Sequence, residues 1–452
     1  MNSLSIGIST QTPPVKFQAE AYQPRPGGSR TSLVEVPRTT QPTPGGVCRM
    51  LLPTLQEWHH SSFMREGHWL SLQPGAPSIP NYGDMPLHLH HLSLPPQELA
   101  AYARTKEKLW ADIHGLPSPP WGVDDFRFYG HFNWINSDAL LESTRKLDIA
   151  YIHDFQLMQL GALIGLAAPS VLRWHVPFDP TRIPAYTRRY LVKAMEDFDA
   201  VIVSTRRDLE GLVKAGYHGE ARQIYPHIDS HSMPDPKASD IRALEDRWRL
   251  SPDSPLILCV ARMDPMKRQD IAIEAFARLR HKHPKARLAL IGNGTFSAAK
   301  QGGLGLSKAH EWRRGLEGMA KRLGVAPEVI FAGHVQDDLL NAAYARSDVV
   351  VLPSDIEGFG LTTLEGWRYG KPSIVSRGAG SAEIVHDGLN GLVFPAGDVA
   401  TLSDQLDRLL TDSETRLRMG EAGRATLRSY DVKEAAGKER EVLTSALEGF
   451  RT

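Results

Sequence analysis

The sequence has few of the features that mark secreted or membrane proteins. Its only two cysteines, Cys48 and Cys259, lie far apart in apolar stretches, so it has no disulfide framework and we expect a cytoplasmic location. No apolar run approaches the roughly 20 residues that span a bilayer. The N-terminus, MNSLSIGISTQTPPVKF, lacks a charged start followed by an apolar stretch, so it does not predict a secretory signal.

An excess of either charge is also missing. Lys+Arg and Asp+Glu number 52 each, which gives no electrostatic reason to expect a nucleic-acid partner. What is present is typical of a soluble globular protein, with 41% hydrophobic and 23% charged residues. A length of 452 residues exceeds what one ordinary core supports and predicts two domains.

From about residue 145, short β-branched runs alternate with longer amphipathic segments. This alternation predicts an α/β fold with parallel sheets covered on both faces. The polar, proline-containing stretch at 228–240 suggests a linker between two Rossmann-like domains that face each other across a deep cleft. We place these domains at 1–232 and 250–428. Residues 429–452 form a helix, for which packing on the N-terminal domain is one option.

The first 120 residues are rich in proline, and we interpret them as loop-rich. The run HLHHL at 88–92 resembles a metal-binding tract, but we interpret it as part of an irregular surface segment. Since no spacing of His, Cys and Asp argues for zinc, we expect no metal site.

The stretch SDIEGFGLTTLEGWRYGKP, residues 354–372, has the strongest functional signal. It leads from an apolar strand through a Gly-Phe-Gly turn into a helix that ends near Gly370. Backbone amides of Gly360, Leu361 and Thr362 would lack helical partners and suit an anion. Carboxylates accept hydrogen bonds from sugar hydroxyls, so Glu357 and Glu365 predict a sugar on each side of a diphosphate. The alternative is a capped helix with two solvated glutamates.

A basic pair, Arg262 and Lys267, follows the strand LILCV. A guanidinium fork and a point charge at a strand end suit a phosphate, although such a pair is often ordinary surface charge. In the first half, HDFQ (153–156) and RWHVPFD (173–179) end neighbouring strands, which would bring Asp154, Gln156 and His175 to a polar wall of the cleft. The Gly-Gly turn at Gly45 and Gly46 precedes an apolar helix and could also approach a ligand or be a simple turn.

Together these residues resemble the retaining glycosyltransferases of family four, which have the GT-B fold. The match to the Glu-x7-Glu signature of that family is EGFGLTTLE, residues 357–365. The resemblance covers roughly residues 40–430. Within the family, GGVCRMLLP, IHDFQ, RWHVPFD and ARMDPMKR are most similar to the trehalose glycosyltransferring synthases, which join a nucleotide-activated glucose to free glucose.

The resemblance implies a role for each matching residue. Arg262 and Lys267 would hold the donor diphosphate, Glu365 the ribose, and Glu357 the donor sugar, with help from the amides of Gly360, Leu361 and Thr362. The same resemblance places His175 at the reaction centre with Arg262, Lys267 and Glu357, and it places Gly46, Asp154 and Gln156 on the acceptor side. The N-terminal 40 residues and residues 292–312 match nothing in this pattern.

The expected reaction transfers a sugar from a nucleotide diphosphate sugar to a small sugar acceptor, and glucose is the first candidate for the transferred sugar. No tightly bound cofactor is expected, and stimulation by Mg²⁺ and formation of a homodimer are left open. The donor base, UDP, ADP or GDP, is also left open, as are acceptors such as a sugar phosphate, glycerate, a lipid or a natural product. Two rival interpretations are a nucleotide-sugar epimerase of the same architecture and a non-catalytic sugar-nucleotide sensor.

Overall fold

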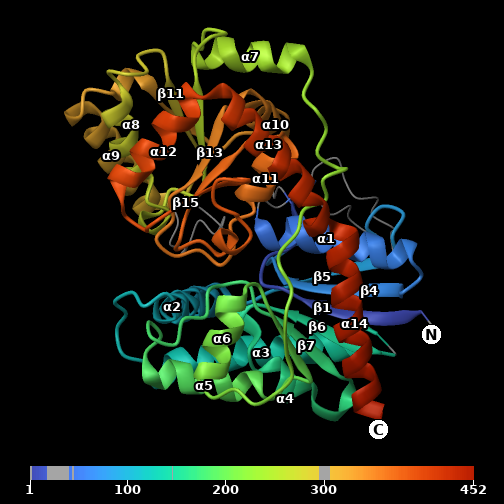
Figure 1. The fold of residues 1–452 in the computed structure, drawn as a ribbon. Coiled ribbons are helices and arrows are strands. Elements are labelled where there is room, and N and C mark those ends of the chain that lie inside the picture. Colours follow the sequence, from blue (N-terminus) through green and yellow to red (C-terminus); the bar gives the residue numbers. More distant parts are fainter. Residues whose placement is uncertain (1–2, 18–39, 43–44, 145, 295–305, 452) are drawn as a thin grey trace, which may run out of the picture. The chain divides into compact units, whose positions relative to one another are not determined.

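The computed structural model describes residues 3–17, 40–42, 45–144, 146–294 and 306–451. The chain divides into two compact units. Unit 1 comprises Met1–Tyr225 and Val432–Thr452, and unit 2 comprises Pro226–Asp431. The last helix of the chain therefore belongs to unit 1 (Figure 1).

Unit 1 contains a parallel sheet of seven strands in the order β5-β4-β1-β6-β7-β8-β9. Short β-branched runs form its central strands, as the sequence predicts. Their bounds are β1 (Leu4–Ser9), β4 (Met64–Leu72), β5 (Leu87–Leu92), β6 (Ile149–His153), β7 (Ser170–Arg173), β8 (Ala200–Val203) and β9 (Ala221–Gln223). A separate antiparallel pair consists of β2 (Val15–Phe17) and β3 (Thr40–Pro42).

Helices cover both faces of this sheet because successive strand side chains point to opposite faces. Ile152 belongs to a core shared with helices of one face, whereas its neighbour Tyr151 belongs to the core of the other. The first face carries α2 (Pro96–Ile113), α3 (Val123–Ser143), α4 (Leu160–Ile164), α5 (Ala185–Met195) and α6 (Arg206–Lys214). The second carries α1 (Gly46–His60) and α14 (Val432–Arg451).

Unit 2 contains a parallel sheet of six strands in the order β12-β11-β10-β13-β14-β15. Every strand coincides with an apolar run that the sequence predicts as a strand. They are β10 (Leu256–Val260), β11 (Arg287–Ile291), β12 (Val329–Gly333), β13 (Val349–Leu352), β14 (Ser373–Ser376) and β15 (Gly391–Phe394). The order of the strands turns back between β10 and β13, which is where ligands bind in open sheets of this kind.

Two cores also flank the sheet of unit 2 (Figure 1). Ile257 and Cys259 face a core with α8 (Gln269–Leu279), α9 (Leu306–Arg322), α12 (Val399–Thr411) and α13 (Ser413–Leu427). Leu256 and Leu258 face the other, with α7 (Ala238–Trp248) and α10 (Asp337–Arg346). The short helix α11 (Thr362–Arg368) follows β13. Three 3₁₀ turns matter below: η2 (Phe155–Leu157), η4 (Pro265–Lys267) and η6 (Gly380–Glu383).

The structure corrects two interpretations of the N-terminal region. The run HLHHL is not irregular, because it forms most of β5 and pairs with β4 along its whole length. The first 120 residues also contain β1, β4 and β5 of the main sheet and two long helices, α1 and α2. The many prolines suggested loops, but many of them lie between these elements, where they interrupt no hydrogen bonds of a sheet or helix.

Cys48 and Cys259 are both buried free thiols, so the expectation of no disulfide is confirmed. Within the described parts of the chain, no helix combines the length and the apolar character that crossing a membrane requires.

Candidate active site

The end of β10 holds the predicted basic pair in unit 2. After β10, Asp264 accepts a hydrogen bond from the Met266 amide at 3.0 Å and so begins the turn η4. This turn brings Lys267 inward, where the residue is 7% exposed. Arg268 then takes a left-handed conformation, with φ 51°, and α8 begins at the next residue. This local structure, formed by the end of β10, the Asp264 cap and the turn η4, buries the ammonium group of Lys267. From the neighbouring residues in the sequence, that group would be expected at the surface.

Lys267 forms an ion pair with Glu357, one of the two signature glutamates. Ser354 at the end of β13 donates a hydrogen bond to the same carboxylate oxygen at 3.2 Å. Burial alone would raise the pKa of Glu357, but Lys267, Arg262 and Ser354 together lower it below its ordinary value. Arg262, Lys267 and Glu357 therefore form one charged cluster, although they are up to 95 residues apart in numbering, from 262 to 357.

The turn after Glu357 requires glycine. Gly360 has φ 99°, and a Cβ at this position would lie 2.3 Å from Leu352 Cδ2. The helix α11 starts two residues later. At its start, Thr362 Oγ1 is buried and has no hydrogen-bond partner among the described residues. A buried hydroxyl without a partner beside a charged cluster is what a polar ligand would satisfy.

Glu365 is not a solvated glutamate. It is 7% exposed on α11, and the buried Tyr344 donates a hydrogen bond to its Oε2 at 2.5 Å. Tyr344 in turn stacks on Tyr369, with the ring centroids 6.0 Å apart. This rules out the alternative of two solvated glutamates and leaves a carboxylate held rigidly on a short helix.

Sequence reasoning missed Gly292, which follows β11. Its φ is 135°, and a Cβ would lie 2.1 Å from the carbonyl oxygen of Ala261. Met263 donates its amide to the Asn293 carbonyl at 3.2 Å. The backbone after β11 thus lies against the segment that carries Arg262. The dipeptide Gly-Asn after a strand was the available signal. Residues 295–305, which include most of the segment that matched nothing, lie outside the described residues.

The polar strand ends of unit 1 centre on Asp154. This residue adopts φ 72°, a conformation that non-glycine residues rarely take. Its amide donates to the Arg173 carbonyl at 2.9 Å, which ties the ends of β6 and β7 together. Carboxylate Oδ1 is buried without a hydrogen-bond partner in the described residues. Burial raises the pKa of Asp154 to about 7, although hydrogen bonds from the backbone amides of Phe155 and His175 act in the opposite direction and lower the pKa.

His175 lies beside Asp154, and a second histidine holds it there. His153 Nδ1 lies 3.0 Å from His175 Nε2, and the two rings are nearly parallel, with centroids 5.3 Å apart. Burial, together with Arg173, lowers the pKa of His153 to about 3, so His153 stays neutral and selects the tautomer of His175. His153 was not predicted as a site residue, although it directly precedes Asp154.

The other two predicted residues of unit 1 are less closely tied to this group. Gln156 lies half-buried in η2, where its carbonyl accepts from Asn133 Nδ2 at 3.1 Å. Gly46 is exposed at the start of α1, and its neighbour Gly45 accepts the Arg49 amide at 3.1 Å.

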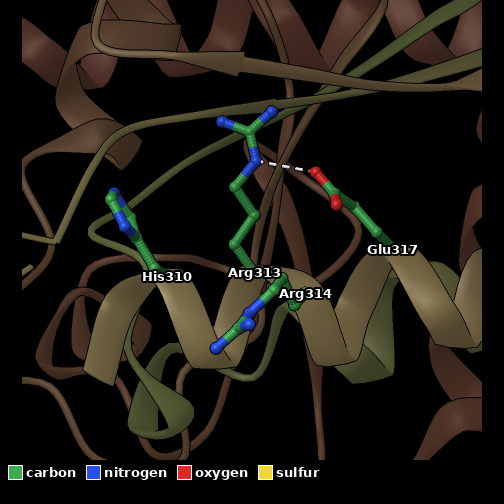
Figure 2. Close-up of a pocket in the computed structure, with 4 residues that line it drawn as sticks. All are labelled: His310, Arg313, Arg314 and Glu317. Atoms are coloured by element: carbon green, nitrogen blue, oxygen red, sulfur yellow. Dashed lines mark hydrogen bonds and ion pairs between the residues drawn. The ribbon is translucent and has the colours of Figure 1, made fainter. Parts of the chain in front are cut away.

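A hollow on the surface of unit 2 lies elsewhere, over one face of α9 (Figure 2). It is lined by His310, Arg313, Arg314 and Glu317. Arg313 Nε donates to Glu317 Oε1 at 2.8 Å, so one cation of this group is already paired. None of the predicted site residues lines this hollow.

Comparisons with known proteins agree with this architecture. The family model for glycosyl transferases group 1 matches residues 240–426. The sulfoquinovosyl transferase of Arabidopsis thaliana is 31% identical over 320 residues, which cover 67% of this chain and 57% of that protein. A D-inositol 3-phosphate glycosyltransferase of Xylanimonas cellulosilytica is 31% identical over 321 residues, covering 69% of this chain and 70% of that protein. The chain thus spans little more than half of the first relative.

A solved structure shows the same fold over nearly the whole chain. It is an α,α-trehalose-phosphate synthase (UDP-forming) from Burkholderia xenovorans, with a TM-score of 0.76 and 17% identity, covering 98% of this chain and 100% of that one. The fold expected from the sequence, GT-B with two parallel-sheet α/β domains, is confirmed. The Xylanimonas relative, 31% identical and matched over 70% of its length, shows that the chain belongs to the glycosyl transferases group 1.

Proposed function

We propose that this chain transfers a hexose, with retention, from a nucleoside diphosphate sugar to a small polyhydroxyl acceptor. The observation that carries the proposal is the cluster of Arg262, Lys267 and Glu357 beside the glycine turn at Gly360. Two cations suit a diphosphate, and a carboxylate held at low pKa stays ionised to accept hydroxyl hydrogens of the sugar. The words "UDP-forming" in the name of the Burkholderia neighbour support such a donor.

In the proposed reaction, the main contribution of the protein is to stabilise the leaving group. As the bond from the sugar to the diphosphate breaks, negative charge grows on the departing phosphate, and Arg262 and Lys267 would neutralise it. Glu365, held by Tyr344, would accept the ribose hydroxyls, and the amides of Gly360, Leu361 and Thr362 would contact the phosphate. By analogy with the family, attack comes from the same face, so no side chain has to act as a nucleophile.

For the acceptor we propose an uncharged sugar, with free glucose as the first candidate and a trehalose-type disaccharide as the product. Asp154, His175 and Gln156 at the strand ends of unit 1 offer a carboxyl, an imidazole and an amide, which suit hydroxyls. Arg173 of β7 is fully buried and lies near Glu439, so its guanidinium is not available to a phosphorylated acceptor.

The relatives keep a second candidate open. The Xylanimonas relative is named for D-inositol 3-phosphate, and the Burkholderia structure was solved with glucose-6-phosphate. Both names describe phosphorylated polyols. A phosphorylated acceptor is therefore the competing proposal for this site.

A screen of donors against acceptors separates these proposals. The full chain would be incubated with UDP-, ADP- and GDP-glucose, each combined with free glucose, glucose 6-phosphate, inositol phosphate, glycerate or a lipid extract, and the products read by mass spectrometry. A disaccharide of two glucose units is expected. A product formed only from phosphorylated or lipid acceptors would refute the free-sugar acceptor, whereas an isomerised or unchanged donor in all mixtures would point to an epimerase or a sensor.

A further inference from the structure

The strands β4 and β5 lie at one edge of the unit 1 sheet (Figure 1). They carry a cluster of histidines. His68 of β4 pairs in register with His88 of β5. Glu66 and His90 lie two residues from these positions and therefore share the same face of the sheet. One ligand atom from each of Glu66, His68 and His88 lies within 4.8 Å of the other two.

The contacts of His68 point to a ligand at this place. His68 is only 6% exposed, and its Nε2 is buried with no hydrogen-bond partner among the described residues. Its other ring nitrogen, Nδ1, lies 3.2 Å from His90 Nε2. Since Nδ1 is engaged by His90, Nε2 is the atom that His68 can offer to a ligand. An unsatisfied buried nitrogen beside a carboxylate and a second imidazole is costly unless something binds there.

We propose that Glu66, His68 and His88 bind a divalent first-row transition metal ion such as Zn²⁺. Imidazole and carboxylate are the ligands that suit zinc, and three protein ligands leave a fourth position for water. Ligand atoms of a tetrahedral site with bonds near 2.1 Å lie about 3.4 Å apart, so small side-chain rotations from the observed arrangement would complete the site. The contact between His68 Nδ1 and His90 Nε2 would orient the His68 ring through its second nitrogen, as outer contacts do in metal sites.

One neighbouring charge competes with a metal ion for the Glu66 carboxylate. Arg65 Nη2 lies 3.1 Å from Glu66 Oε1, so a metal ion would compete with the arginine for this carboxylate or use its other oxygen.

The proposed role is structural, and it is independent of the glycosyltransferase reaction. The strand β5 forms an edge of the sheet: among the described residues β4 is its one strand neighbour, and a single antiparallel bridge joins its Leu89 to Ile79 on the other side. A metal ion bound by side chains of both strands would fasten this edge to the rest of unit 1. Metal binding should therefore raise the thermal stability without changing the specificity for donor or acceptor.

Metal titration of the untagged full chain tests the proposal. After dialysis against a chelator, the protein would be titrated with Zn²⁺ in a calorimeter and with Co²⁺ in a spectrophotometer. We expect one equivalent to bind, with visible Co²⁺ absorption typical of four-coordinate geometry, and a rise in Tm on the order of 2–4 °C in excess Zn²⁺.

Variants localise the binding. His88→Asn changes a half-buried residue at the sheet edge and should abolish binding of the first equivalent, whereas His90→Asn should weaken it by roughly 10- to 100-fold. His218→Asn, at an exposed position outside the cluster, is the matched control and should bind as the unmodified chain does. The proposal is wrong if the unmodified chain binds less than one equivalent, or if His88→Asn leaves affinity and stoichiometry unchanged.

Discussion

Asp154 in unit 1 and Glu357 in unit 2 have pKa values that are shifted in opposite directions. Burial raises the pKa of Asp154 to about 7 because no cation or side-chain donor compensates it. Glu357 is also partly buried, but Lys267, Arg262 and Ser354 hold its pKa below the ordinary value. Opposite shifts of two carboxyls indicate different tasks. Glu357 suits a permanently charged partner for hydroxyls and cations, whereas Asp154 can hold or release a proton near neutral pH.

Replacing Lys267 or Arg262 by alanine should cut turnover roughly 10²- to 10³-fold, because each removes a charge that stabilises the departing diphosphate. Steady-state kinetics with the donor and acceptor found in the screen would measure this. Lys282→Ala removes an exposed lysine of the same unit and should have no effect. Because Lys267 also pairs with Glu357, the melting temperature of Lys267→Ala has to be recorded beside its rate. Near-normal turnover in either variant would remove the diphosphate role.

Asp154 should make unit 1 less stable as the pH rises from about 4 to 7. An unfolded chain releases the Asp154 proton near its ordinary pKa of 3.8, while the folded chain keeps it until about 7. The folded state therefore binds more protons in this window, and its stability falls with pH. With allowance for the partial exposure of the residue, the difference between pH 5 and pH 8 is on the order of 1–2 kcal/mol.

The variant Asp154→Asn lacks this titration. The free energy of unfolding of this variant, relative to that of the unmodified chain, should rise by about 1–2 kcal/mol between pH 5 and pH 8. Chemical denaturation followed by hydrogen exchange of peptides from β6 and β7 would measure unit 1 separately from unit 2. A parallel pH dependence of the two proteins would contradict the raised pKa.

At the scale of elements, α14 is fastened to unit 1 by buried polar contacts as well as by apolar packing. Trp58 of α1 donates from Nε1 to the Ala436 carbonyl at 2.9 Å. Arg173 of β7 lies 3.5 Å from Glu439 of α14, and the side chains are 0% and 2% exposed. The guanidinium also donates to the carbonyls of Val203 and Ile224. The helix thus completes the second face of the sheet and neutralises a buried arginine next to the site at β7.

Glu439→Ala should destabilise unit 1 by about 3–5 kcal/mol, because it leaves the buried charge of Arg173 uncompensated. Thermal unfolding and hydrogen exchange of α14 peptides would measure the loss. Glu441→Ala, two residues away at an exposed position, should change the stability by less than about 0.5 kcal/mol. Equal effects of the two variants would show that the Arg173–Glu439 pair contributes nothing specific.

At the scale of the whole molecule, the residues proposed to bind the two substrates are divided between the two units. The residues for the donor, such as Glu365, lie in unit 2, and those for the acceptor, such as Gln156, lie in unit 1. Each unit forms its own sheet and cores. Substitutions in one unit should therefore change the kinetic constants for one substrate and leave those for the other almost unaffected.

Two variants test this division. Glu365→Ala should raise the KM for the donor more than it lowers kcat, because the ribose lies away from the bond that breaks and is bound equally in ground and transition states. Gln156→Ala should raise the KM for the acceptor and leave donor binding, measured by calorimetry, unchanged. An unchanged donor KM with a collapsed kcat in Glu365→Ala would contradict the ribose role. Weakened donor binding in Gln156→Ala would contradict the division between units.

The amino-acid sequence by itself determined most of the strands and several of the helices from residue 145 onward, and the location of the charged motifs after strand ends. Short apolar runs such as LILCV and DVVVLP, bounded by turn residues, favour buried strands, and Lys267 and Glu357 lie in the loops that follow them. Local pattern and turn chemistry suffice for these inferences, since neither depends on distant residues.

Only the tertiary structure decided which side chains meet. His68 and His88 are twenty residues apart and become neighbours through the register of β4 and β5. His153 was passed over because its contact with His175 exists only when β6 and β7 pair. The contact that holds Glu365, its hydrogen bond from Tyr344, could not be read from the sequence because the two residues meet only through packing. Sheet pairing and burial are long-range properties, and they set the pKa values and contacts on which the proposed chemistry depends.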